Sequence, residues 1–228
     1  MIPFAGKSIL AIQLDKLKHL DYPIIVATST NKADDTIESM CQKMDVECVR
    51  GSEQDVLDRF LYTLRQHPST NVVRICSDNP FLDIGLMQQM IENHLESDSD
   101  YTSYVYKETP VMLTHFGFFA EIVKAEALQK LDSMTIDKAV CREHVTNCLY
   151  TDPENFSINF IPLDESEFST KRIRLTIDTP EDFSMAEDIF TTLEKKHQAF
   201  NYKHVVEYLN ENQEILSYME KQIKRNSK

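Results

Sequence analysis

Short apolar runs alternate with amphipathic segments along most of this chain. Continuous β-branched runs, such as residues 23–27, are typical of strands that are buried on both faces. Segments with apolar residues three or four positions apart, such as residues 54–65, are typical of helices. The repeated strand and helix pattern predicts β-α-β units. We therefore expect an α/β domain with a mostly parallel sheet and helices on both faces.

The pattern assigns most of the chain to specific elements. The predicted strands cover residues 23–27, 46–50, 71–76, 101–106, 116–123, 156–162 and 173–177. The predicted helices cover residues 8–20, 34–44, 54–65, 84–95, 125–131, 136–149, 180–196 and 202–224, the last one broken near residues 210–212. We expect one domain over residues 1–200, followed by a helical tail over residues 201–228.

Two aspartates each follow a predicted buried strand. Asp78 comes after residues 72–76, and Asp178 comes after residues 173–177. Ligands of open α/β sheets bind beyond the carboxyl ends of the strands, so two carboxylates there predict Mg²⁺ or Mn²⁺ that holds phosphate. Two alternatives involve no ligand. Asp78 can form a local turn through its side chain, and Asp178 can cap the next helix, although Thr179 is better placed for that.

Further polar residues lie near the predicted strand ends. Ala27, Thr28 and Ser29 close the first strand, where hydroxyls can bond a base or ribose, or can simply cap a helix. Arg59 lies just inside a helix and can reach a phosphate or base, or pair with Asp55 four residues earlier. Arg74, within a strand, requires a carboxylate or phosphate partner.

Composition and charge exclude several classes of protein. The 228 residues carry a net charge of −13, which argues against nucleic-acid binding because that needs a basic surface. There is neither an apolar run of the ~20 residues that a membrane span needs nor a secretory signal, so we expect a cytoplasmic protein. The five cysteines are therefore interpreted as reduced, buried thiols. With four glycines, the chain has no Gly-rich phosphate loop.

Several segments together are similar to one family. They are IIVATSTNKADDTIE at residues 24–38, RGSEQDVLDRF at 50–60, VVRICSDNPFLD at 72–83, REHVT at 142–146 and RLTIDTPEDF at 174–183. This set resembles the spore coat polysaccharide biosynthesis protein F family, which belongs with the acylneuraminate and CMP-Kdo cytidylyltransferases. The resemblance implies a three-layer α/β/α sandwich of the nucleotide-diphospho-sugar transferase type. It also implies transfer of CMP from CTP to a sugar or sugar acid in surface or spore-coat polysaccharide synthesis.

The resemblance also implies roles for individual residues. Asp78 and Asp178 would hold Mg²⁺ or Mn²⁺ and support catalysis. The nucleotide would be bound by Ala27, Thr28, Ser29 and Arg59. Arg142 and His144 would face the sugar, although a lone histidine on a helix is more often structural. CTP and a sugar or sugar acid would be the substrates.

The sequence departs from the family pattern in two places. The family opens with a strand and a loop rich in Gly, Arg and Lys that binds the triphosphate, whereas the first residues here resemble the segment after that loop. We therefore expect a domain that lacks its first strand, with lowered stability or a homodimer formed through the gap. Where the family carries Gly-x-Asp-x-Glu, residues 117–121 read GFFAE, with Phe119 in place of the acid. An impaired homologue, a binding or assembly module and a metal-dependent glycosyltransferase are the alternatives.

Overall fold

The computed structural model describes residues 2–134, 138–168 and 172–225. Its helices are α1 (Ile9–Leu17), α2 (Asp35–Lys43), α3 (Val56–Gln66), α4 (Ile84–Ser97), α5 (Ala125–Ser133), α6 (Lys138–Glu143), α7 (Asn147–Tyr150), α8 (Pro180–Lys196), α9 (Tyr202–Glu211) and α10 (Gln213–Arg225), with 3₁₀ turns η1 (Lys32–Asp34) and η2 (Val111–Leu113). Its strands are β1 (Ile25–Ser29), β2 (Glu47–Gly51), β3 (Asn71–Arg74), β4 (Tyr101–Tyr106), β5 (Thr109–Pro110), β6 (Glu121–Lys124) and β7 (Ile158–Pro162). None of the helices described here combines the length and apolar character that a membrane span requires.

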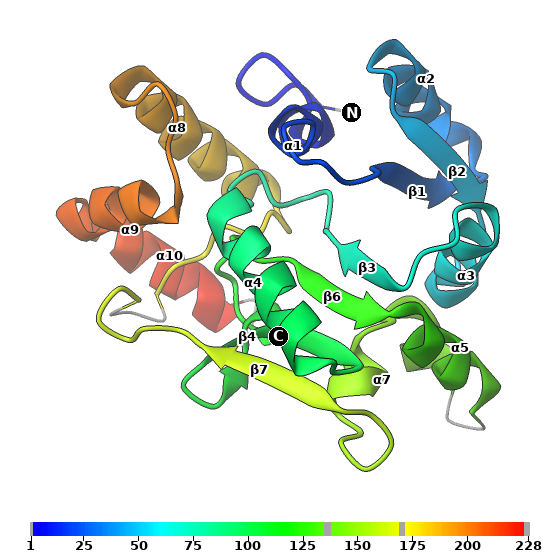
Figure 1. The fold of residues 1–228 in the computed structure, drawn as a ribbon. Coiled ribbons are helices and arrows are strands. Elements are labelled where there is room, and N and C mark those ends of the chain that lie inside the picture. The colour runs from blue at the N-terminus through cyan, green and yellow to red at the C-terminus, as the bar shows by residue number, and fades with distance from the viewer. Residues whose placement is uncertain (1, 135–137, 169–171, 226–228) are drawn as a thin grey trace.

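The main sheet is mixed, so the expectation of a mostly parallel sheet is wrong. Its strand order is β3-β6-β4-β5, and β7 pairs with β4. The β3–β6, β4–β6 and β4–β5 pairs are antiparallel, and β4–β7 is parallel. The chain travels from β4 to β6 without a crossover helix, so β6 returns in the opposite direction between β3 and β4. In contrast, α4 connects β3 to β4, which consequently run in the same direction (Figure 1).

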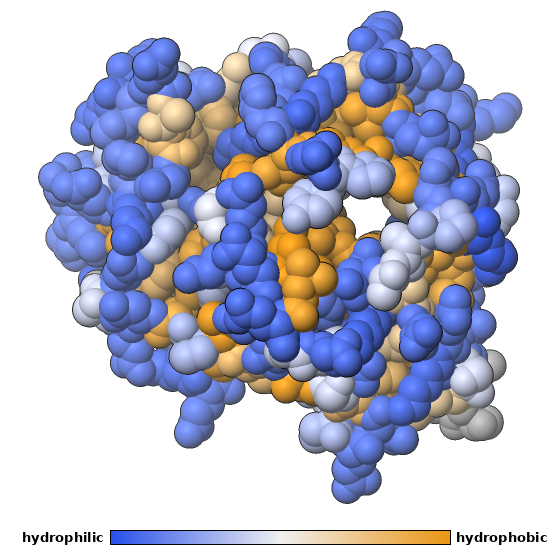
Figure 2. Space-filling model, viewed as in Figure 1, coloured by the Kyte–Doolittle hydropathy of each residue, from blue (hydrophilic) through white to orange (hydrophobic). Residues whose placement is uncertain are grey.

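A second, separate sheet contains β1 and β2. These strands are parallel, with Ile25 opposite Glu47 and Ser29 opposite Gly51, and α2 connects them. Among the residues that the structure describes, β1 pairs only with β2, and β3 pairs only with β6. Figure 2 shows an opening through the molecule between this small sheet and β3. The facing edges of β1 and β3 therefore do not join the two sheets into one.

Helices cover both faces of the main sheet. On one face, α4 contacts β4, β6 and β7 (Figure 1), and Tyr104 packs in one core cluster with Met90. On the other face, Tyr101 packs with Leu61 of α3 and Leu128 of α5 in a second cluster. The alternation along β4 places successive side chains on opposite faces of the sheet. The layered α/β architecture that the sequence predicts is thus present around this sheet.

The carboxyl-terminal helices share the first core cluster. The predicted break near residues 210–212 is confirmed, because α9 ends at Glu211 and α10 begins at Gln213. Val205 and Leu209 of α9 and Leu216 and Met219 of α10 are buried in the cluster that contains Met90. The division of the chain at residues 200 and 201 stays a prediction, and residues 1 and 226–228 lie outside the described residues.

Two further expectations are corrected. The segment 173–177 is buried but forms no strand; instead, the amides of Leu175 and Thr176 both donate to the carbonyl of His115. The predicted helix 136–149, whose first two residues lie outside the described part, is divided into α6 and α7. Cys141 and Cys148 form a disulfide across that division, so these two cysteines are not reduced thiols. Sequence spacing alone could not show that their Cα atoms lie 5.5 Å apart.

Candidate active site

A small cleft opens beside the turn that follows β3. Its volume is about 70 Å³, and its lining residues are Cys76, Asp78, Asn79, Val111, Met112, Thr114, Gly117, Phe119 and Thr176. Asp78 is exposed at the cleft, while the neighbouring Asn79 is buried. Within the described residues, Oδ1 of Asn79 is buried without a hydrogen-bond partner. The cleft thus combines a carboxylate in contact with solvent and a polar atom for which the fold supplies no donor.

The opposite wall of the cleft depends on Gly117. This residue has φ +73°, and a Cβ atom there would lie 3.0 Å from the carbonyl carbon of Leu175. Glycine is therefore required both by the backbone conformation and by the close approach of segment 173–177. Phe119, the residue that replaces the family's acid, is buried and lines the same cleft. At the position of the family's acid, the cleft wall is therefore aromatic and carries no carboxylate.

Asp178 is connected to the same cleft by a hydrogen bond from Thr176. The hydroxyl of Thr176, which lines the cleft, donates to Oδ2 of Asp178 at 3.3 Å. Asp178 does not cap α8, because Thr179 and Asp182 form the capping box of that helix. The sequence-based preference for Thr179 as the cap is confirmed, which leaves Asp178 with its side chain 42% exposed.

A buried arginine holds Asp178 from behind. The side chain of Arg174 has no exposed surface, and it donates to Asp178 at 2.9 Å and to both carboxylate oxygens of Asp182 at 2.8 and 2.7 Å. It also contacts Nδ1 of His115 at 2.8 Å. A guanidinium has only donors, so this nitrogen of His115 is the acceptor. The network fixes the backbone and the charge beneath Asp178.

The pKa of Asp182 reflects a balance within this network. Burial raises the pKa of the Asp182 carboxyl. Hydrogen bonds from Arg174, Thr179 and the Asp178 amide together lower the pKa by more than burial raises it, so the pKa lies below its usual value. Asp182 is therefore ionised and neutralises Arg174. Asp178 lies at the surface. Its two side-chain hydrogen bonds, from Arg174 and Thr176, both go to Oδ2, so among the described residues Oδ1 takes no part in this network.

The two aspartates supply the donor chemistry of a Mg²⁺ or Mn²⁺ site. No group of three or more His, Cys, Asp or Glu side chains suited to a metal occurs within the described parts of the chain. Mg²⁺, however, is commonly held by one or two carboxylates together with phosphate oxygens and waters. Asp78 and Asp178 fit that pattern because both are exposed carboxylates: Asp78 lines the cleft, and Asp178 accepts a hydrogen bond from Thr176 of the cleft lining. They would hold the ion together with a phosphate-bearing ligand.

The predicted nucleotide residues lie at the end of β1. The hydroxyls of Thr28 and Ser29 donate to Asp34 at 2.9 and 2.6 Å, and the Ser29 amide donates to it at 3.2 Å. These bonds, the Ser29 hydroxyl first, lower the pKa of Asp34 against the effect of burial. In this structure the two hydroxyls hold Asp34, the last residue of η1, which directly precedes α2, and Ala27 lies just before them in the strand.

Arg59 lies on α3 beside the same strand pair. Its Nη1 donates to the carbonyl of Ser52 at 2.8 Å, and its Nε is buried without a hydrogen-bond partner among the described residues. Burial lowers the pKa of Arg59, and the nearby charge of Asp34 opposes that shift. The alternative ion pair with Asp55 does not form, since Asp55 pairs with Arg142 instead. The Nε donor of Arg59 can therefore bond a ligand only if the side chains that bury it move aside.

The predicted sugar-side residues are separate from the cleft. Arg142 pairs with Asp55 at the start of α3, at 3.1 Å, and with Asp132 at the end of α5. His144 is exposed between α6 and α7. Neither residue lines the cleft that contains Asp78. The structure therefore places Arg142 nearer to the α3 helix of Arg59 than to the aspartate pair.

Sequence reasoning missed most of the network behind the aspartates. It identified Asp78, Asp178 and the need for a partner to Arg74, which is confirmed because Arg74 pairs with the buried Glu121. It did not identify Arg174 or Asp182. The available signal was an arginine inside the apolar run 173–177, since a buried arginine requires a carboxylate partner.

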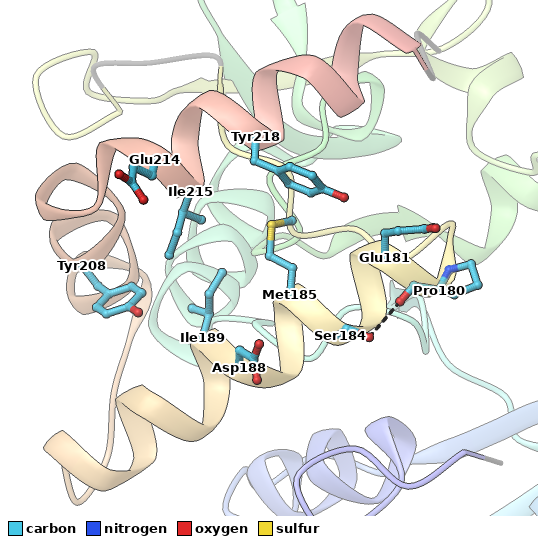
Figure 3. Close-up of a pocket in the computed structure, with 10 residues that line it drawn as sticks. All are labelled: Pro180, Glu181, Ser184, Met185, Asp188, Ile189, Tyr208, Glu214, Ile215 and Tyr218. Carbon is cyan, nitrogen blue, oxygen red and sulfur yellow. Dashed lines mark hydrogen bonds between the residues drawn. The ribbon is translucent and has the colours of Figure 1, made fainter.

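A second groove lies between α8 and the α9–α10 pair. Figure 3 shows its apolar floor and the acidic side chains at its edge. Its volume is about 630 Å³, and its lining residues are Pro180, Glu181, Ser184, Met185, Asp188, Ile189, Tyr208, Glu214, Ile215 and Tyr218. None of the predicted site residues lines this groove. We therefore regard the cleft at Asp78 as the candidate active site.

Comparison with solved structures defines the class of protein. The structure is similar to a cytidylyltransferase from Leptospira borgpetersenii, with a TM-score of 0.82, 24% identity and coverage of 94% of this chain and 88% of that one. It is also similar to a CMP:2-keto-3-deoxy-manno-octonic acid synthetase complexed with CTP, with a TM-score of 0.63, 7% identity and coverage of 84% and 90%. The protein therefore has the α/β fold of the nucleotide-diphospho-sugar transferases.

Sequence comparison defines the family within that class. The family described as "Cytidylyltransferase" matches residues 1–223. The chain is 34% identical over 221 residues to the uncharacterized protein MJ1063 of Methanocaldococcus jannaschii, covering 94% of this chain and 85% of that protein. It is 31% identical over 167 residues to the spore coat polysaccharide biosynthesis protein SpsF of Bacillus subtilis, covering 73% and 66%. The chain belongs to the cytidylyltransferase family.

Proposed function

We propose that this chain transfers the cytidylyl group of CTP to a hydroxyl of a sugar or sugar acid. The reaction belongs to the synthesis of a surface or spore-coat polysaccharide. Family membership supports the nucleotide chemistry, and the similarity to a spore coat polysaccharide biosynthesis protein supports the acceptor class. The observation that carries the proposal is the cleft lined by Asp78 and Thr176, with Asp178 bonded to Thr176 and held by Arg174.

The proposed chemistry is an in-line displacement at phosphorus. The acceptor hydroxyl oxygen forms a bond to the α-phosphorus of CTP, the bond from that phosphorus to the bridging oxygen breaks, and pyrophosphate leaves. The hydroxyl proton passes to water. A bound Mg²⁺ or Mn²⁺ would neutralise charge on the phosphate oxygens. Asp78 and Asp178 would hold that ion, and Arg174 would keep Asp178 in place. Positioning and electrostatics supply most of the rate enhancement in such transfers.

Pyrophosphate release tests this function directly. The wild-type chain is incubated with CTP, Mg²⁺ and a panel of sugars and sugar acids, with UTP and GTP in parallel. We expect release that depends on CTP and on one acceptor class. Asp78→Ala and Asp178→Asn should each lower the rate by 100-fold or more, whereas Asp21→Ala, at an exposed acid before β1, should leave it unchanged. Undiminished release from Asp78→Ala would refute the role of Asp78.

An impaired homologue that binds nucleotide without turnover is the second candidate. It is favoured by the lining of the cleft, which includes no lysine or arginine among the described residues. Isothermal titration with CTP and Mg²⁺ separates the two candidates, because binding without pyrophosphate release on any acceptor supports a binding module. The expected homodimer stays a prediction. Light scattering after size-exclusion chromatography gives the mass that decides it.

A further inference from the structure

Gln13 connects the turn that carries Asp78 to α1 through two hydrogen bonds. The side-chain amide of Gln13 donates to the carbonyl of Cys76 at 2.9 Å and to the carbonyl of Asn79 at 2.8 Å. These two carbonyls lie on either side of Asp78 in the chain. Gln13 is 2% exposed, so both bonds are shielded from water. Each is consequently stronger, and more costly to lose, than a bond at the surface.

Lys16 fastens the following residues of the same turn. Its Nζ donates to the carbonyls of Pro80 and Leu82 at 3.1 and 3.2 Å. The same ammonium lies 5.9 and 5.5 Å from the ring centres of Phe190 and Phe200. Hydrogen bonds from a charged donor are stronger than those between neutral groups. Two side chains of α1 therefore bond four backbone carbonyls between residues 76 and 82, the segment that contains Asp78.

Helix α1 is well suited to serve as a fixed support. Gln13 and Lys16 are three positions apart, so they lie on the same face of the helix. Ser8 caps the start of α1, and Leu14 and Leu17 are buried beneath it. The turn, by contrast, has no strand or helix pairing of its own from residue 75 to residue 83. The bonds from α1 therefore hold a backbone that no strand or helix pairing fixes, together with local bonds such as that from the Asp83 amide to the Phe118 carbonyl.

We propose that Gln13 and Lys16 are positioning residues that set where the Asp78 carboxylate meets its ligand. The inference rests on the proposed function, in which Asp78 holds the metal with phosphate. Neither side chain touches the cleft itself, so each acts through the backbone. Residues that orient a metal ligand from behind change metal affinity or activity by about 10- to 100-fold when they are replaced.

The test uses variants that remove the donors and keep the apolar bulk. Gln13→Leu and Lys16→Met are compared with Lys18→Met, a control at the residue that caps the end of α1, whose Nζ bonds the Met44 carbonyl away from the turn. Binding of Mn²⁺ in the presence of CTP is measured by titration, and amide hydrogen exchange is measured over residues 76–82. Thermal unfolding shows that each variant is folded. Asp78→Asn is included to test the metal role alone.

We expect Gln13→Leu to weaken Mn²⁺ binding by about 10- to 100-fold and to accelerate exchange over residues 76–82. Lys16→Met should act in the same direction, and Lys18→Met should match the wild type. Wild-type exchange over the turn in both Gln13→Leu and Lys16→Met would overturn the inference. Wild-type Mn²⁺ binding by Asp78→Asn would instead overturn the proposed metal role, while the exchange data would still decide whether α1 positions the turn.

Discussion

Replacement of Asp182 by asparagine should strongly destabilise the protein without touching the cleft. Asp182 is 1% exposed, and both of its oxygens accept bonds from Arg174, whose side chain is fully buried. Asparagine offers one acceptor and turns a donor toward the guanidinium. The buried charge of Arg174 then loses its main counter-charge. Breaking a buried pair by removing one partner costs about 3–5 kcal/mol.

The expected size of the effect makes it easy to measure. For a protein of this length, 1 kcal/mol corresponds to about 2–4 °C in Tm, so Asp182→Asn should lower Tm by roughly 6–20 °C. Scanning calorimetry or circular dichroism provides the assay. Asp188→Asn, at an exposed acid on the same helix, is the matched control and should shift Tm by about 1 °C or less.

A double variant distinguishes the loss of a charge partner from loss of packing. Replacing both partners of a buried ion pair with apolar residues is often neutral or stabilising. Arg174→Met combined with Asp182→Leu should therefore unfold at a higher temperature than Asp182→Asn alone. A Tm of Asp182→Asn within about 2 °C of the wild type would refute the reasoning, because it would mean that Asp182 does not neutralise Arg174.

Three further predictions concern other parts of the molecule. Burial lowers the pKa of Lys16 from its ordinary 10.5 to about 8, against the opposing charges of Asp83 and Glu194. Between these two pKa values the unfolded chain binds more protons than the folded chain, so the free energy of unfolding rises with pH. In urea titrations, the wild type should gain about 2 kcal/mol over Lys16→Met from pH 7.5 to pH 9.5. A difference between the two proteins that does not change with pH would count against the burial of the charge. Reduction with dithiothreitol should lower stability by about 2 kcal/mol, because the Cys141–Cys148 disulfide closes a short loop. Cys141→Ser should remove this response, and a response that persisted would show that another pair is reduced. Amide hydrogen exchange should be faster in β1 and β3 than in β4. In the described residues β1 pairs only with β2 and β3 only with β6, whereas β4 is paired with both β6 and β7. Equal protection would contradict the separation of the two sheets.

Local sequence patterns predicted the features that depend on neighbouring residues. The break between α9 and α10, the capping role of Thr179 and most helix positions follow from side chains within a few residues of each other. The need for a partner to Arg74 also followed from local context, because a charge inside a strand cannot remain unpaired. The identity of that partner, Glu121, is 47 residues away and required the fold.

By itself, then, the sequence determined the layered α/β class, the family and the two exposed aspartates, because periodicity, turn residues and motifs are local properties of the chain. Only the tertiary structure decided the direction of β6, the division into two sheets, the disulfide and the contacts behind the candidate site. Gln13 lies more than 60 positions from the carbonyls that it bonds, and Arg174 lies 59 positions from His115. Such contacts depend on how buried charges and carbonyls find partners across the folded core, which no local pattern encodes.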